Sequence, residues 1–205
     1  MKKIFVYTLL LTFCCCAENA PRQSYLKSDE LIDMHFNKYQ ITDLEKLMAF
    51  FESEICGTVP STPEEAITCY KAYGKLLADR SSFGNMDLKI PLEKQNRLLE
   101  EIRPVTFEAI WVKANDDANT TSNGLFGLKY GGQYANFLKH FAKENETIQQ
   151  YVDVFDQAGI ITPSMIANVL LDYEKFGIED QRGRLALAIH YLTLNRMFAE
   201  AEALE

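Results

Sequence analysis

Two neighbouring stretches decide the fold: ITDLEKLMAFFESEICG at residues 41–57 and STPEEAITCYKAYGKLL at residues 61–77. In the first stretch, Thr42 followed by Glu45 has the capping-box pattern of a helix start, and Gly57 is typical of a helix end. The apolar residues between them recur at the spacing of one helix face, formed by Leu44, Leu47, Met48, Phe51 and Ile55. We therefore predict an amphipathic helix that follows Thr42 and ends at Gly57.

The second stretch has the same kind of punctuation. Thr62 is placed to cap a helix, Pro63 fits the first helical position, and Glu65 completes a second capping box. Its apolar side consists of Ile67, Tyr70, Tyr73, Leu76 and Leu77. Because few residues separate the two helices, they should pack as an antiparallel hairpin.

The hairpin could bring together two of the five cysteines, Cys56 and Cys69. We predict that they form a disulfide, which an exporting environment would permit. Two separate buried thiols and a catalytic thiol are the alternatives. A zinc site is not indicated, because two cysteines with no histidine close in sequence fall short of four ligands.

The rest of the chain continues with helix signals. We expect a helix from near Pro91 to before Pro104, and a short helix capped by Thr106 that carries Trp111. Later helix starts and ends are indicated at Gly132, Asn145, Gly159, Thr162 with Pro163, Gly177 and Asp180. Strand signals are weak. The predicted fold class is all-α: an irregular bundle of seven or eight helices that forms a single domain over residues 28–205.

The N-terminus reads MKKIFVYTLLLTFCCC, residues 1–16. Lys2 and Lys3 form a positive n-region, and the apolar run behind them is too short to span a bilayer as a helix. This pattern is typical of a secretory signal. A cysteine directly after such a run resembles the signal of bacterial lipoproteins, which implies that the cysteine becomes the lipidated first residue of the mature chain.

This resemblance implies a simple organisation for the N-terminus. We expect a signal peptide at residues 1–15, a lipid on Cys16 or else on Cys15, and a polar tether at residues 16–27. Cleavage after Ala17 without lipidation is one alternative, and a retained N-terminal anchor is another.

Composition excludes several classes of protein. Apolar residues make up 47% of the 205 residues and charged residues 24%, which indicates a core-forming chain and not a disordered one. The formal net charge is −8, so a nucleic acid backbone is an unsuitable partner. The same charge gives no electrostatic help in binding anionic lipids, so membrane contact is expected through the lipid anchor only.

Motifs that carry chemistry are missing from the sequence. It holds no HExxH, P-loop, GxSxG or GxGxxG pattern. His35, His140 and His190 fall in three separate helical segments, and we interpret each as a surface or satisfied histidine. The polar run at residues 116–119 resembles part of a calcium loop but lacks the glycine and glutamate that an EF-hand needs. We predict no catalytic residue, no metal site and no cofactor.

The most unusual composition is NGLFGLKYGGQYANF at residues 123–137, which holds four of the ten glycines. Glycine allows close backbone approach, and aromatic residues with polar tips suit a wet binding surface. We predict that Phe126, Tyr130 and Tyr134, with Trp111 beside them, form a binding segment. The alternative is an irregular loop that packs on the core through its aromatic rings.

Taken together, these features favour a non-enzymatic cell-envelope lipoprotein whose helical body binds another protein. The expected partner is an unidentified envelope or extracellular protein, and the body should face the periplasm or the cell surface. A small-ligand or carbohydrate binder with an aromatic groove is the first alternative. An enzyme with a site assembled from distant residues is the second.

Overall fold

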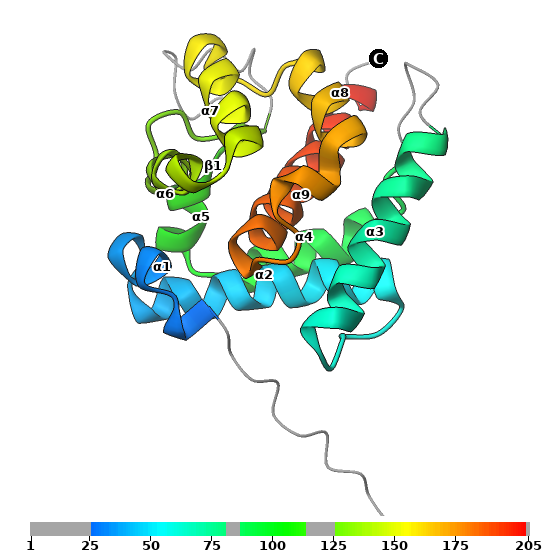
Figure 1. The fold of residues 1–205 in the computed structure, drawn as a ribbon, viewed down its shortest axis with the longest axis horizontal. Helices are drawn as coiled ribbons and strands as arrows, with labels where there is room; N and C mark the ends of the chain where they lie inside the picture. The colour runs from blue at the N-terminus through cyan, green and yellow to red at the C-terminus, as the bar shows by residue number, and fades with distance from the viewer. Residues whose placement is uncertain (1–25, 81–86, 114–125, 204–205) are drawn as a thin grey trace, which may run out of the picture.

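The computed structural model describes residues 26–80, 87–113 and 126–203 (Figure 1). Nine α-helices lie in these ranges: α1 (Glu30–His35), α2 (Lys38–Cys56), α3 (Pro63–Arg80), α4 (Leu92–Glu101), α5 (Pro104–Ile110), α6 (Gln133–Phe141), α7 (Glu146–Ala158), α8 (Pro163–Asp172) and α9 (Gln181–Glu202). Three short 3-10 helices accompany them: η1 (Leu26–Ser28), η2 (Ala142–Glu144) and η3 (Tyr173–Phe176). The predicted all-α class is confirmed.

The last helix, α9, forms the centre of the bundle (Figure 1). All its residues from Gly183 to Leu194 are buried, and α9 packs against α2, α4 and η3. A helix that is buried on every side is enclosed by other elements and does not lie on the surface. The buried apolar side chains form one continuous cluster that extends from Leu26 to Leu194.

The predicted hairpin is present as α2 and α3, and Gly57 ends α2 with a φ of +77°. The start of α2 differs from the prediction. Asn37 caps the helix, because its side chain accepts hydrogen bonds from the amides of Tyr39 and Gln40 at 2.9 and 3.1 Å. The Gln40 side chain accepts from the Asn37 amide in return, at 3.0 Å. The predicted cap at Thr42 is therefore wrong, and the Thr42 hydroxyl donates to the Lys38 carbonyl inside the helix.

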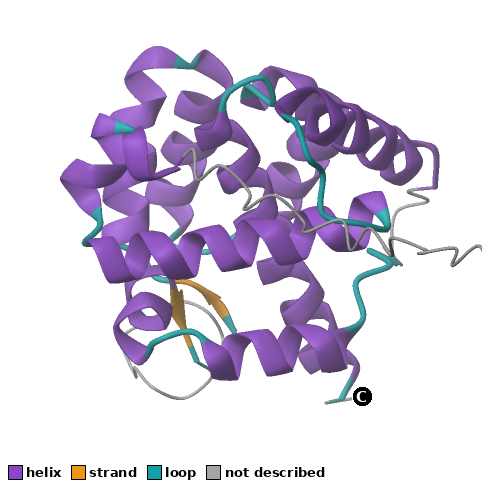
Figure 2. Ribbon diagram, turned by 90° about the horizontal axis from the view of Figure 1, so that it is seen from below, coloured by secondary structure: helices purple, strands orange, loops and turns teal. Residues whose placement is uncertain are grey.

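The segment after Pro104 also differs from the prediction. The expected cap, Thr106, lies inside α5, and its hydroxyl donates to the buried carboxylate of Asp43 at 2.7 Å. Asp43 also accepts from the backbone amide of Arg103, at 3.1 Å, so a side chain of α2 caps α5. Trp111 is not helical, because it pairs with Leu128 in a two-stranded antiparallel sheet of β1 (Trp111–Val112) and β2 (Gly127–Leu128), shown in orange in Figure 2.

The other predicted caps are confirmed. Side chains of Asn145, Thr162 and Asp180 accept hydrogen bonds from the first amides of α7, α8 and α9. Two elements near the N-terminus were not predicted, η1 and α1. Leu26 of η1 is completely buried, so the predicted tether at residues 16–27 overlaps the folded body by two residues.

Candidate functional site

The small sheet fixes two of the four predicted binding residues in the core. Trp111 and Phe126 are 1% and 3% exposed, and their ring centroids lie 5.8 Å apart. The Trp111 indole donates to the hydroxyl of Thr193 on α9 at 2.8 Å. The Phe126 amide donates to the Glu200 carboxylate, also on α9, at 2.9 Å. Both residues therefore attach the sheet to the central helix.

Tyr134 is buried as well. It lies in the first turn of α6, is 2% exposed, and packs with its ring centroid 6.0 Å from that of Phe137. The pKa of the Tyr134 hydroxyl lies well above its ordinary value. Burial is the main cause, and the neighbouring Tyr151 is a smaller one. A neutral phenol inside the core has a packing role in this conformation.

Tyr130 is the member of the predicted set that reaches the surface, with 52% of its area exposed. It lies in the turn between β2 and α6, where the Lys129 amide donates to the Ile110 carbonyl at 2.8 Å. The next residue, Gly131, has a φ of +64°, which favours glycine. The centroid of the Tyr130 ring lies 6.2 Å from that of Phe155 on α7, and the two rings are inclined at 54°.

Of the four predicted binding residues, Tyr130 is therefore the one whose side chain is exposed. Because Trp111 and Tyr134 are buried, they do not line an open groove for a small ligand in this structure. A small hollow between α7, α8 and η3 is lined by other aromatic residues, Tyr151 and Phe176. The rest of the predicted segment, residues 123–125, and the polar run at 116–119 lie outside the described residues.

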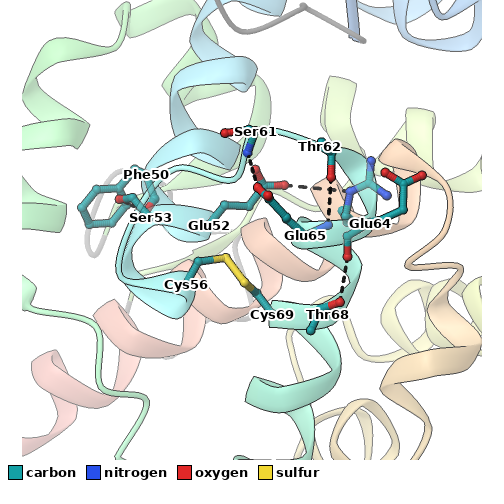
Figure 3. Close-up of a disulfide and its surroundings, with 11 residues drawn as sticks. Phe50, Glu52, Ser53, Cys56, Ser61, Thr62, Glu64, Glu65, Thr68 and Cys69 are labelled. Atoms are coloured by element: carbon teal, nitrogen blue, oxygen red, sulfur yellow. Dashed lines mark hydrogen bonds and ion pairs between the residues drawn. A yellow bond between two sulfur atoms is a disulfide. The ribbon is translucent and has the colours of Figure 1, made fainter. Parts of the chain in front are cut away.

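The predicted disulfide is present between Cys56 and Cys69, whose Cα atoms lie 5.4 Å apart (Figure 3). The connection after Gly57 folds back far enough to bring the second turn of α3 beside the end of α2. At the start of α3, the Glu65 amide donates to the Thr62 hydroxyl at 3.2 Å, and the Glu65 carboxylate accepts from the Ser61 amide at 2.7 Å. These bonds hold the connection in place.

A buried ion pair lies near the disulfide. The Arg184 Nε of α9 lies 3.9 Å from the Oε1 of Glu52 on α2, and both side chains are almost fully buried. Arg184 Nη1 also donates to the backbone carbonyl of Ile178 at 2.7 Å. If one partner were removed, the other charge would be buried without a counter-charge, which is strongly destabilising. The pair therefore favours the arrangement in which α9 packs against α2. Its enclosure gives it a structural role and no access for a substrate.

The three histidines have different surroundings. His190 is buried in α9, where its Nδ1 lies 3.0 Å from the Tyr151 hydroxyl, and burial lowers its pKa to about 3. His35 and His140, which are 105 residues apart in sequence, meet in space with a nitrogen-to-nitrogen distance of 2.6 Å. Sequence reasoning missed this pair. The apolar stripe of α6 gave a partial signal, because His140 lies beside Phe137 and Phe141.

Two searches of the described ranges give negative results. No group of three or more His, Cys, Asp or Glu side chains there could hold a metal ion. None of the helices in those ranges has the length and apolar character that crossing a membrane requires. Comparisons with protein-family models, curated proteins and solved structures found no match for this chain.

Proposed function

We propose that this chain is an exported, lipid-anchored protein of the bacterial cell envelope whose helical body binds another protein without catalysing a reaction. The observation that carries the proposal is the N-terminal pattern: two lysines, a short apolar run and Cys14, Cys15 and Cys16. Cys16 is the preferred lipidation site and Cys15 the second choice.

The folded body supports an exported location. Disulfides persist in oxidising compartments and are rare in the cytosol, and Cys56 is joined to Cys69. The chain enters the folded body at Leu26, so a lipid on Cys16 would hold the body within about 35 Å of the membrane surface. A partner close to the same membrane surface would lie within that reach.

The proposed contact surface is the turn that carries Tyr130. An aromatic side chain that is half exposed and flanked by a left-handed glycine offers a rigid, amphipathic contact at low entropic cost. The adjacent Lys129 and Gly131 are also exposed, which leaves the ring accessible from the solvent side.

Anchoring is tested by replacing Cys14, Cys15 and Cys16 with serine and separating cell extracts into detergent and aqueous phases. We expect the native chain in the detergent phase and the triple variant in the aqueous phase, because stable anchoring requires the acyl chains. The matched control is the Cys56→Ser, Cys69→Ser variant, which loses two cysteines and should stay in the detergent phase. A triple variant that still enters the detergent phase would refute the anchor.

Binding is tested by cross-linking and capture from solubilised membranes with Tyr130→Ala. An aromatic anchor of an interface contributes about 2 kcal/mol or more, so we expect roughly 30-fold weaker capture with an unchanged melting temperature. Tyr39→Ala is the control, since Tyr39 is 55% exposed but lies on α2. Equal capture by the native chain and both variants would contradict the proposed contact.

A further inference from the structure

Histidines from two helices meet where α1 packs against α6. His35 Nε2 lies 2.6 Å from His140 Nδ1, and the ring centroids lie 4.7 Å apart with the rings inclined at 61°. Both side chains are only half-buried, so protons from solvent can reach them. At this distance the two nitrogens share one hydrogen, which one ring donates and the other accepts.

The number of protons on the pair decides whether this bond exists. Two neutral imidazoles can form it, and so can one imidazolium and one neutral imidazole, because in each case one nitrogen has a free lone pair. Two imidazolium rings cannot form it, since every ring nitrogen then carries a hydrogen. Both rings also become cations at contact distance, which adds repulsion.

The bond matters because α1 is short and depends on tertiary contacts. A helix of six residues is unstable alone, and α1 is held by the burial of Ile32 and by Phe36 just after it. The ring of Phe36 lies 5.7 Å from that of Phe137 on α6. Gln133 of α6 also donates to the backbone carbonyl of His35. The histidine pair thus lies beside the buried part of the contact between α1 and α6.

The elements around the histidine pair also carry charged side chains. Charged side chains on η1, α1, the first turn of α2 and α6 are Lys27, Glu30, Asp33, Lys38 and Lys139. Around α6, charged side chains are Glu108 on α5, Lys143 and Glu144 on η2, and Glu146, Asp153 and Asp156 on α7. Four of these charges are paired, because Lys27 lies 3.2 Å from Glu45, Lys139 2.8 Å from Asp156, and Glu144 2.8 Å from Arg182.

We propose that the pair formed by His35 and His140 is an acid-sensitive latch, which releases α1 from α6 when both imidazoles are protonated. Release exposes apolar side chains that the contact buries, Ile32 of α1, Phe36 just after it and Phe137 of α6, while the rest of the bundle stays folded. The other end of α1 is fixed independently, because Asp29 caps the helix and accepts from Gln181 of α9 at 3.2 Å. The released segment therefore stays held at both ends, by Asp29 and by the α2 cap Asn37.

The direction of the pH effect follows from the folded contact. The pKa of His35 lies below its ordinary value of 6.5. Burial is the larger cause, and the nearby His140 is the smaller one. The closed contact thus binds fewer protons than the open one, so closure is favoured above pH 6.5 and is lost as the pH falls. If opening takes up one proton, its equilibrium constant increases by at most about tenfold per pH unit below 6.5.

The test is amide hydrogen exchange of the full-length protein at pH 7.0 and 5.0, with rates converted to protection factors. The reporters are the amides of Asp33 and Phe36, which donate to the carbonyls of Asp29 and Ile32 at 2.9 and 2.8 Å. We expect their protection to fall about tenfold or more in the native chain, relative to amides in the middle of α2.

Two variants make the test specific. His140→Gln and His35→Gln each leave one imidazole beside a neutral amide, so the double cation cannot form. His35→Gln removes the imidazole whose pKa the closed contact lowers, so its loss of protection should stay below about threefold. His140→Gln keeps the burial of His35 and should lose less protection than the native chain. The second variant covers the case in which the first does not fold. The latch is refuted if α1 in the native chain loses no more protection than α2, or if a folded variant loses as much as the native chain.

Discussion

Burial of His190 predicts that the whole fold loses stability in mild acid. This imidazole is 2% exposed inside α9, and desolvation alone lowers its pKa to about 3. In the unfolded chain the same group titrates near 6.5. Between these two values the unfolded state binds a proton that the folded state does not bind, so unfolding becomes more favourable as the pH falls below 6.5.

The magnitude follows from the separation of the two pKa values. At pH 4.5 the unfolded imidazole is protonated and the folded one is still neutral. Each pH unit below 6.5 contributes about 1.4 kcal/mol, so His190 should remove roughly 2 to 3 kcal/mol of unfolding free energy between pH 7 and pH 4.5. That is a large fraction of the stability of an ordinary domain, which is about 5–15 kcal/mol.

The assay is guanidinium unfolding of the native chain and of His190→Gln at several pH values from 7.5 to 4.5. The comparison is between the slopes of unfolding free energy against pH, so the absolute stability of the variant does not matter. Below pH 6.5 the slope of the variant should be smaller by about 1.4 kcal/mol per pH unit. Tyr151→Phe is the control. It removes the hydroxyl that bonds Nδ1 but leaves the imidazole buried, so its slope should match that of the native chain. Parallel curves for all three proteins would refute the reasoning.

Two further predictions concern packing and the disulfide. A Cβ on Gly183 would lie 2.2 Å from the Gly177 carbonyl oxygen, which is backbone, so Gly183→Ala should cost about 2–3 kcal/mol by chemical denaturation. Gly74→Ala, where the Cβ would lie 2.4 Å from a ring atom of the half-buried Tyr173, forces that side chain to move but no backbone, so it should cost less than Gly183→Ala; equal costs would contradict this account. Replacing Cys56 and Cys69 with serine should reduce stability by about 3 kcal/mol, and a change below about 1 kcal/mol would show that the bridge hardly constrains the unfolded chain.

Three helix starts could be predicted from capping contacts that are local. Asn145, Thr162 and Asp180 each bond amides within three residues, so their identity and position were enough. The predicted helix start at Thr42 was wrong because Asn37 forms a capping box with Gln40. This box begins α2 about one turn earlier. The cap of α5 could not be read from its own residues, since Asp43 supplies it from another helix.

Contacts between distant segments could not be predicted, because periodicity shows which face is buried but not what covers it. Gln95 donates to the Leu192 carbonyl at 2.7 Å across 97 residues, and His35 meets His140 across 105. In both cases each partner alone looks like an ordinary polar residue. The Cys56–Cys69 contact was predictable because its partners lie 13 residues apart, on two helices joined by a short turn.

The glycine and aromatic segment shows why composition is a weaker guide than spacing. Its glycines do permit close approach, but a Cβ on Gly132 would lie 3.1 Å from the Ala109 carbonyl oxygen, so the neighbour is the chain itself and not a ligand. Tyr134 falls on the same helical stripe as Phe137, which should have assigned it to the core. Tyr130 lies outside any such stripe. Its ring lies near that of Phe155, but half of its area stays exposed, so Tyr130 is the residue at which a binding role should be tested first.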